Sequence, residues 1–352
     1  MVYIKKEIPE ILQTAVNMGA SDVHIKVGLK PAFRIRREIE VQADLPRISE
    51  ENTLEYLDEI TTDEQRDQFN NDLELDFAYS VAGIGRFRVN AYCELGTVGF
   101  VFRRIPQVIP DFRELGLPDI CADLCLRKSG LVILTGPAGS GKTTTLAAMI
   151  NYMNKHVKRR IITVEDPIEF VYESNKCVIS QREIGTDTHS FAEALRHITR
   201  QDPEVIVVGE MRDIDSMTIA INGAETGHLI LTTLHTPSSR GAIEYIVGSF
   251  PPYQQEQIRI QLSSTLEAVL YQMLLPRTDA EGLIPAVEIL MGTPAIKQLI
   301  RDNRLNQIPV YMQKSEDPGM QTLAKSVENL YAKGIIRKDN LLVETPYSLV
   351  MR

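Results

Sequence analysis

The sequence has no long apolar run. Its longest apolar stretches, such as residues 131–134, have the length of a strand, whereas a helix that spans a membrane needs about 18 to 20 apolar residues. Residues 1–10 also lack the apolar core that is typical of a secretory signal. The sequence therefore predicts a chain that does not cross a bilayer and that stays in the cytoplasm.

Cysteine is scarce, and basic residues are fewer than acidic ones. The four cysteines, Cys93, Cys121, Cys125 and Cys177, include no C-x-x-C pair, which favours reduced structural thiols over a disulfide framework or a zinc site. The 38 Lys and Arg residues are outnumbered by 47 Asp and Glu, for a net charge of -9. Because binding to nucleic acid needs clustered cations, we expect no nucleic-acid partner.

The chain of 352 residues is long enough for two domains. Near the N-terminus, residues 7–18 and 50–69 have the spacing of helices, and alternating patterns predict half-buried antiparallel strands. These predicted strands lie at 21–27, 32–36, 77–79, 86–90 and 99–103. We therefore expect a small α+β domain at residues 1–105.

A proline cluster separates this part from the rest of the chain. Pro106, Pro110 and Pro118 predict a linker at residues 106–120, because proline lacks a backbone donor and restricts the residue before it. Beyond it, short apolar strands alternate with helical segments, which is typical of a parallel α/β sheet. These strands are predicted at 131–135, 161–164, 205–208 and 229–234. We assign residues 121–352 to a second domain and expect mainly helices from about Pro251 onward.

Residues 136–143, GPAGSGKT, match the Walker A pattern G-x-x-x-x-G-K-[ST] between a predicted strand and a predicted helix at 144–153. Glycines let successive backbone N–H groups turn toward phosphate, and the helix N-terminus adds a positive dipole end. We expect Lys142 to reach the β- and γ-phosphates and the Thr143 hydroxyl to supply a Mg²⁺ ligand. The expected nucleotide-binding residues are Gly136, Pro137, Ala138, Gly139, Ser140, Gly141, Lys142, Thr143 and Thr144.

Acidic residues follow two of the predicted strands, at the edge where open α/β sheets bind ligands. Glu210 follows the strand at 205–208, in the Walker B position, and would hold the metal through water or polarise the attacking water. Glu165, Asp166 and Glu169 follow the strand at 161–164. Spacing alone does not choose among these three acids.

Two histidines, His228 and His235, flank the predicted strand at 229–234. A single histidine is more often structural, but we place both near the phosphate edge and expect both to contact phosphate. A purely structural role for each is the alternative.

The chain resembles the type II/IV secretion ATPase superfamily, and most closely its type IV pilus retraction (twitching motility) ATPases. The matching segments are GASDVHI at 19–25, GRFRVNAY at 85–92, GPAGSGKTTTLAAMINYMN at 136–154, IITVEDPIEFVY at 161–172, VIVVGEMRD at 205–213, AETGHLILTTLHT at 224–236 and TPAIKQLIRD at 293–302. The resemblance implies an α/β protein with a PAS-like α+β N-terminal domain followed by a RecA-like P-loop ATPase domain, assembled into a homo-hexamer that uses ATP and Mg²⁺.

The same resemblance assigns roles to single residues. Glu169 and Glu210 would flank the catalytic water and the metal ion, with support from Glu165 and Asp166. The two histidines would sense phosphate. Arg88 and Arg103 would reach the nucleotide of a neighbouring subunit, although their strand pattern alone would make each a solvated residue.

The resemblance also implies partners and a location. An ATPase of this kind would drive pilin removal at an inner-membrane platform protein, on the cytoplasmic face of the inner membrane, with a second retraction ATPase as a further partner. Residues 295–302 read AIKQLIRD, where retraction ATPases typically read AIRNLIRE. The apolar face of this segment either packs on its own domain or couples the motor to the pilus machine. An assembly or secretion ATPase, or a partner subunit with weak turnover, is the alternative function.

Overall fold

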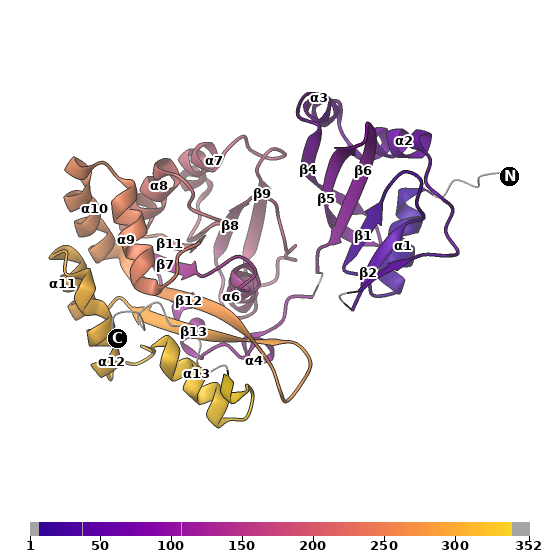
Figure 1. Cartoon of the computed structure of the whole chain (residues 1–352). Helices are drawn as coiled ribbons and strands as arrows, with labels where there is room; N and C mark the ends of the chain where they lie inside the picture. Colours follow the sequence, from indigo (N-terminus) through magenta and orange to yellow (C-terminus); the bar gives the residue numbers. More distant parts are fainter. Residues whose placement is uncertain (1–6, 37, 107, 340–352) are drawn as a thin grey trace. The chain divides into compact units, whose positions relative to one another are not determined.

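The computed structural model describes residues 7–36, 38–106 and 108–339, and Figure 1 shows the path of the chain. The chain divides into two units, Met1–Val108 with Pro167–Phe170, and Ile109–Asp166 with Val171–Arg352. Residues 1–6 and 340–352, at the ends of the two expected domains, lie outside the described residues. No helix in the described ranges is long and apolar enough to cross a membrane.

The first unit is an antiparallel sheet with an apolar face and a polar face. Its elements are α1 (Ile8–Asn17), β1 (Asp22–Ile25), β2 (Ala32–Ile35), β3 (Glu38–Val41), α2 (Glu50–Ile60), α3 (Asp63–Asp72), β4 (Glu74–Val81), β5 (Gly85–Glu94) and β6 (Thr97–Arg104). The strand order is β3-β2-β1-β6-β5-β4. Phe33, Val23, Phe102, Val89 and Phe77 form a buried row across five strands, in one core with residues of α1 and α2. The expected α+β domain with half-buried strands is therefore present.

The structure differs from the expectations for residues 1–120 in three places. The helical stretch expected at 50–69 is two helices, because Thr62 begins a new one. The Thr62 hydroxyl accepts from the Gln65 backbone N–H, and the Gln65 side chain accepts from the Thr62 N–H, which is a capping box. The exposed edge strand β3 was not predicted. Within the range expected to be a linker, Asp111 caps a short helix, α4 (Phe112–Leu115).

The second unit is a mixed, mostly parallel sheet with helices. In its described part the sheet has the strand order β13-β12-β7-β11-β10-β8-β9, and all neighbours except β12 and β13 are parallel. The strands are β7 (Gly130–Thr135), β8 (Arg160–Glu165), β9 (Val178–Glu183), β10 (Val205–Val208), β11 (Leu229–Leu234), β12 (Leu266–Pro276) and β13 (Leu283–Met291). The helices are α4, α5 (Ile120–Cys125), α6 (Lys142–His156), α7 (Phe191–Ile198), α8 (Ile214–Glu225), α9 (Ser239–Ser249), α10 (Pro252–Thr265), α11 (Pro294–Arg301), α12 (Ile308–Lys314) and α13 (Leu323–Ala332), with short 3-10 turns at Thr199–Gln201 and Leu305–Gln307.

Helices cover both faces of this sheet. Leu131 and Ile133 of β7 share a core with α7, α8, α9 and α10, whereas Val132 and Leu134 share a core with α5 and α6. Burial on both faces explains why the central strands are continuous apolar runs. The expected α/β architecture is confirmed.

The expectation of mainly helices after Pro251 agrees with α10, α11, α12 and α13, but it missed two strands. Residues 266–291 contain the long hairpin of β12 and β13, drawn in orange in Figure 1, and β12 extends the sheet by pairing with β7. Both strands are mostly apolar, with Glu267, Gln272 and Glu288 as exceptions, and periodicity alone does not separate a strand buried on two faces from a buried helix. Pro285 is tolerated in β13 because that strand lies at the edge of the sheet.

Candidate functional site

The phosphate-binding loop lies between the end of β7 and the start of α6. Gly136 has a φ of 146° and Gly141 a φ of 84°, values that favour glycine. A Cβ on Gly136 would lie 2.2 Å from the backbone oxygen of Gln272. Because the N-cap of α6 is Gly141, no cap side chain competes for the first N–H groups of the helix. The loop therefore has the backbone geometry that anion binding requires.

Lys142 is the first residue of α6, and it is buried. Its Nζ donates to the carbonyl oxygens of Gly136 and Pro137, both at 2.9 Å, and lies 3.4 Å from Nδ1 of His235. The ammonium group of Lys142 thus lies within the phosphate-binding loop, against its backbone carbonyls. An ammonium binds an anionic oxygen more strongly than a neutral carbonyl, so this group is placed to change partners when a phosphate enters.

Glu210 follows the end of β10 and is held in place from both sides. The hydroxyl of Thr233, on β11, donates to the carbonyl of Gly209 at 2.6 Å. The Glu210 carboxylate accepts from Arg212 Nε at 2.8 Å through Oε2, while Oε1 lies 3.5 Å from Nε2 of His235. The two carboxylate oxygens therefore face two different side chains.

These contacts extend into a continuous row along the carboxyl edge of the sheet. Arg212 Nη1 donates to Asp166 Oδ2 at 3.3 Å, which completes the order Lys142, His235, Glu210, Arg212 and Asp166. We call these five residues the edge row. They follow the ends of β7, β11, β10 and β8, which are neighbours in the sheet in that order. The hydrogen bond to Glu210 is the main reason that the pKa of Arg212 lies above its ordinary value.

The other two acids expected near this edge have different surroundings. Glu165 is buried and accepts from Thr163 Oγ1 at 2.6 Å and from Gln181 Nε2 at 3.2 Å, which ties the end of β8 to β9. Glu169 falls in the segment Pro167–Phe170, which belongs to the first unit. Its catalytic role stays a prediction.

His228 and His235 lie at opposite ends of β11, so the expectation that both lie near the phosphate edge is wrong. Because β11 is a six-residue strand parallel to β7, its rise of about 3.3 Å per residue separates the two histidines by roughly 20 Å. His228 Nδ1 lies 3.0 Å from the carbonyl of Gly223 and 3.1 Å from Thr226 Oγ1, at the end of α8. His228 therefore lies away from the phosphate loop of its own chain.

Arg88 and Arg103 face each other on β5 and β6 of the first unit, on the polar side of its sheet. Arg103 Nε donates to Asp22 Oδ1 at 2.9 Å, whereas Arg88 Nε lies 3.9 Å from Asp76 Oδ1. Burial alone would raise the pKa of Asp22, but the hydrogen bonds and charges of its partners outweigh burial and hold it below the ordinary value. That either arginine reaches a nucleotide stays a prediction.

The oxygen ligands expected for Mg²⁺ are the hydroxyl of Thr143 and the carboxylate of Glu210. Both are hard oxygen donors, the kind that Mg²⁺ prefers, and Mg²⁺ is usually shared between one or two such groups and substrate phosphates. Within the described ranges, no group of three or more His, Cys, Asp or Glu residues is arranged to hold a metal ion. The residues present fit an ion that is held jointly by protein and nucleotide.

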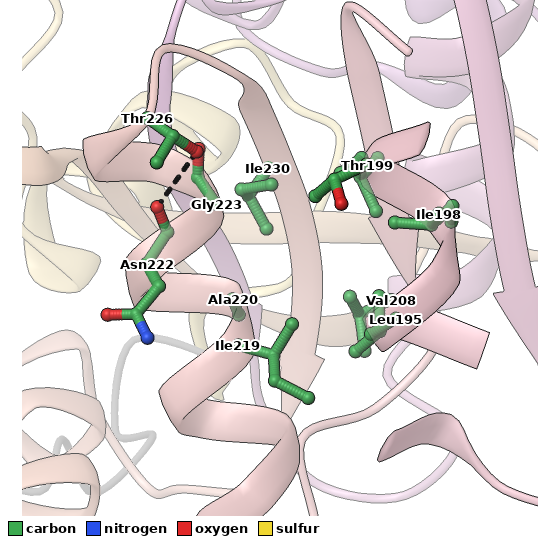
Figure 2. Close-up of a pocket in the computed structure, with 11 residues that line it drawn as sticks. Leu195, Ile198, Thr199, Val208, Ile219, Ala220, Asn222, Gly223, Thr226 and Ile230 are labelled. Carbon is green, nitrogen blue, oxygen red and sulfur yellow. Dashed lines mark hydrogen bonds between the residues drawn. The ribbon is translucent and has the colours of Figure 1, made fainter. Parts of the chain in front are cut away.

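A separate apolar cavity of about 150 Å³ lies between α7 and α8, over β10 and β11 (Figure 2). Its lining includes Leu195, Ile198, Ile219 and Ile230, and the hydroxyl of Thr226 donates to the backbone oxygen of Asn222 at its margin. All of the lining residues are uncharged. Phosphate needs cations or a set of N–H donors, so this cavity is not the phosphate site.

Two residues at the carboxyl edge have no role in the sequence analysis. Arg212 follows Glu210 by two positions, and an ion-pairing arginine after an acidic motif has no distinctive pattern. Gln272 of β12 contacts the phosphate loop through the carbonyl of Ser140. It was missed because residues 266–276 were expected to be helical. The one available signal is an amide within an otherwise apolar run.

Comparison of the sequence with known proteins finds a matching family and similar proteins. The family described as type II/IV secretion system protein matches residues 2–284. The chain is 42% identical to the type IV pilus retraction ATPase PilT of Pseudomonas aeruginosa, over 95% of this chain and 96% of that protein. It is 40% identical to the type IV pilus ATPase PilU of the same organism, over 96% of this chain and 88% of that protein.

Solved structures give a similar result. A crystal structure of the pilus retraction motor PilT with bound ADP matches with a TM-score of 0.91 at 42% sequence identity, and the match covers 98% of this chain and 99% of that one. The similarity therefore includes both the sequence and the fold of nearly the whole chain.

Proposed function

The chain belongs to the type II/IV secretion system protein family, and on that premise we propose that it is an ATP-hydrolysing motor of type IV pilus retraction. The observation that carries the proposal is the edge row, in which Lys142 of the phosphate loop connects through His235 to Glu210. A relative named as a retraction ATPase with 42% identity over 95% of the chain supports the activity. The ADP in a structural relative supports the ligand.

Binding of ATP would use the loop and the start of α6. The backbone N–H groups of residues 139–143 and the dipole of α6 would hold the phosphates, and Lys142 would leave the loop carbonyls for the β- and γ-phosphate oxygens. Thr143 and Glu210 would hold Mg²⁺, which neutralises charge on the phosphate oxygens when it is bound. The remaining expected loop residues, Gly136, Pro137, Ala138 and Thr144, would shape the cradle.

Hydrolysis would depend on Glu210, with Glu169 as a second acid beside the attacking water. A carboxylate that accepts a hydrogen bond from the attacking water orients the lone pairs of that water. It also stabilises the positive charge that develops on the water during attack. Arg212 and His235 fix the direction of the Glu210 carboxylate from two sides. Movement of His235 when Lys142 changes partners would report the phosphate to Glu210.

Force generation would require a ring of six copies. In this arrangement Arg88 and Arg103 of one copy would stabilise the nucleotide of its neighbour, as arginine fingers do, and removal of such a group lowers turnover about 10³-fold. Rings that mix Arg88→Ala with Glu210→Gln subunits should recover part of the turnover, because one type of interface keeps both groups. A complete lack of recovery at every mixing ratio would contradict a shared site.

The proposed partners are protein. An inner-membrane platform protein of the pilus would receive the motion, and the motor would work at the cytoplasmic face of that membrane without inserting into it. The net charge of -9 is consistent with a protein partner rather than with nucleic acid.

A second candidate is an accessory motor that works beside a main retraction ATPase. It is favoured by the 40% identity to PilU, which is nearly as high as the identity to PilT. A main motor would retract pili when it is the cell's only retraction ATPase. An accessory motor would bind ATP but would need the other protein for retraction.

The experiment is complementation of a host that lacks its retraction ATPases. We expect wild-type protein to hydrolyse ATP in a purified assay and to restore retraction of labelled pili in the cell. Lys142→Ala should restore neither. Strong ATP hydrolysis without retraction, either alone or with a second retraction ATPase, would contradict the proposed motor function.

A further inference from the structure

Gln272 occupies an unusual position in the second unit. It lies on β12, which pairs in parallel with β7, with Leu270 opposite Leu134 and Tyr271 opposite Thr135. Gln272 is therefore beside the point where β7 ends and the phosphate loop begins. Its side chain is buried, with 3% of the residue exposed. A buried amide is unfavourable unless its hydrogen bonds are satisfied. The partners of the Gln272 amide should therefore explain why a polar side chain stands at this position.

Both ends of the Gln272 amide are bonded to the phosphate-loop region. Its Nε2 donates to the carbonyl of Ser140 at 2.7 Å, and its Oε1 accepts from the hydroxyl of Thr145 at 2.8 Å. Ser140 lies in the loop and Thr145 lies in the first turn of α6. One side chain thus connects the loop to the helix whose N-terminus would face the phosphates.

The bond to Ser140 also sets the direction of a backbone N–H group. The peptide unit between Ser140 and Gly141 is planar and trans, so its N–H points opposite to its C=O. Because the carbonyl is turned toward Gln272 beneath the loop, the N–H of Gly141 is turned to the other side. That side is where an anion at the N-terminus of α6 would lie.

The backbone of β12 restricts the loop in the same region. A Cβ on Gly136 would lie 2.2 Å from the Gln272 backbone oxygen, and a Cβ on Gly141 would lie 2.9 Å from Gln272 Nε2. The first and sixth residues of the loop therefore pack closely against the same glutamine. The loop has little room to change shape without moving Gln272.

We propose that Gln272 is a positioning residue for nucleotide binding, which holds the phosphate loop in the shape that binds phosphates. The inference rests on the nucleotide site of the proposed function. Gln272 acts through the amides of the loop and does not itself touch the nucleotide. Because those amides bind non-reacting phosphate oxygens in the ground state and the transition state alike, loss of Gln272 should raise Kd and KM rather than lower kcat.

The test compares two glutamine-to-leucine variants of the full chain. Gln272→Leu removes both hydrogen bonds with little change in volume. Gln321→Leu is the matched control, because Gln321 Nε2 donates to the Val287 carbonyl of the neighbouring strand at 2.8 Å, away from the loop. Titration with fluorescent ATP and ADP gives Kd, an assay at saturating ATP gives kcat, and thermal unfolding gives Tm.

We expect Gln272→Leu to bind both nucleotides about 10-fold or more weakly, because the Ser140 carbonyl and the Thr145 hydroxyl both lose their buried hydrogen bonds to the amide. Its kcat at saturation should stay near the wild-type value, and Gln321→Leu should bind with wild-type affinity. Equal affinity of folded Gln272→Leu and wild type would overturn the inference. So would a large loss of kcat at unchanged Kd.

A second variant applies if Gln272→Leu does not fold. Thr145→Val keeps the shape of the side chain and removes only the hydroxyl that bonds Gln272, so it should weaken both nucleotides in the same direction by a smaller factor. Unchanged affinity in folded Thr145→Val would then overturn the inference. A wild-type chain that binds no ATP would instead overturn the proposed function, and the inference with it.

Discussion

The Nε2 atom of His235 lies 3.5 Å from the Oε1 atom of Glu210. On its other side the same imidazole presents Nδ1 to the Lys142 ammonium at 3.4 Å. An ammonium only donates, so Nδ1 accepts and the ring hydrogen is assigned to Nε2, facing the carboxylate. The lysine of the phosphate loop and the proposed catalytic acid therefore lie against the two nitrogens of one imidazole.

The two histidines allow a matched test of this connection. We expect His235→Ala to keep ATP binding but to lose most of its turnover, because Glu210 loses the group that couples it to Lys142. His228→Ala should keep nucleotide affinity and turnover close to wild type and lower the stability by about 1 kcal/mol, since it removes hydrogen bonds at the end of α8. Steady-state ATPase assays and thermal unfolding check both. Equal loss of turnover in the two variants would contradict the assignment.

Lys142 and Glu210 should separate binding from chemistry. Lys142→Ala removes the ammonium inside the loop and should abolish measurable ATP binding. Glu210→Gln keeps the size of the side chain but removes its charge and replaces one acceptor oxygen with an NH2 donor. It should bind ATP with near wild-type Kd and lose about 10²-fold or more in kcat. Calorimetric titration and single-turnover assays measure the two effects. Wild-type ATP affinity in Lys142→Ala would refute the assignment of the phosphate site.

How far the sequence predicts this molecule depends on the kind of signal. The strands expected at 131–135, 161–164, 205–208 and 229–234 differ from the structure by at most one residue at either end, because each is a short apolar run bounded by polar or glycine residues. The hairpin of β12 and β13 escaped prediction because its strands, of 11 and 9 residues, are longer stretches whose length also fits a buried helix. An apolar run without alternation indicates a buried strand only when it is short and clearly bounded.

The site shows the same distinction. The loop and Glu210 follow from local motifs that sit next to predicted strands. Gln272 does not, because its bond to Ser140 joins residues that are 132 positions apart. His228 was placed wrongly because closeness to His235 in the sequence was taken as closeness in space, although an extended strand separates them. Contacts between distant segments need the strand order, which the motifs do not contain.

Arg88 and Arg103 should differ in their effect on stability. Arg103→Ala removes one of the two side-chain hydrogen bonds of the mostly buried Asp22, which keeps the bond from Ser21, and should cost about 1 to 2 kcal/mol. Arg88→Ala loses a longer, exposed ion pair and should cost less than about 1 kcal/mol. Chemical unfolding followed by circular dichroism measures both. A larger cost for Arg88→Ala would contradict the pairing.

The same pair gives a prediction for acid unfolding. The lowered pKa of Asp22 contributes stability that is full above its ordinary value of 3.8 and that is lost as the pH falls through the folded-state value. Without Arg103, only Ser21 and Arg34 oppose the effect of burial, so the pKa of Asp22 should lie higher than in wild type, and Arg103→Ala should begin to unfold at higher pH. Arg88→Ala should follow the wild-type acid transition. Coincident transitions for all three proteins would contradict the role of Arg103.

The four cysteines should differ sharply in reactivity. Burial raises the pKa of the Cys121 thiol to about 12 and raises the pKa of Cys125 and Cys177 as well, so little reactive thiolate forms at these positions. Cys93 is exposed. In the native state we expect a thiol reagent at pH 8 to label Cys93 within minutes and the other three only after unfolding. Peptide mass spectrometry locates the label, and rapid labelling of Cys121 would contradict the packing.

The apolar face of α11 decides between packing and coupling for the segment at 295–302. Ile296 and Ile300 are fully buried, and Leu299 packs against the same core, so this face belongs to the interior of the second unit. Gln298 and Arg301 lie on the exposed side of the helix. Any contact with another component of the pilus machine must therefore use the polar side.

Two variants of α11 test this division. Ile300→Ala should lower the stability by about 2 to 5 kcal/mol through the cavity it leaves, and ATPase activity and retraction should fall together with it. Arg301→Ala removes an exposed side chain and should keep Tm and ATP turnover near wild type, so a loss of retraction in this variant would place the coupling contact on the polar side. Thermal unfolding, the ATPase assay and imaging of pili separate the three effects. Ile300→Ala with wild-type stability but no retraction would contradict the packing role, because only a direct contact of the apolar face with a partner would produce that result.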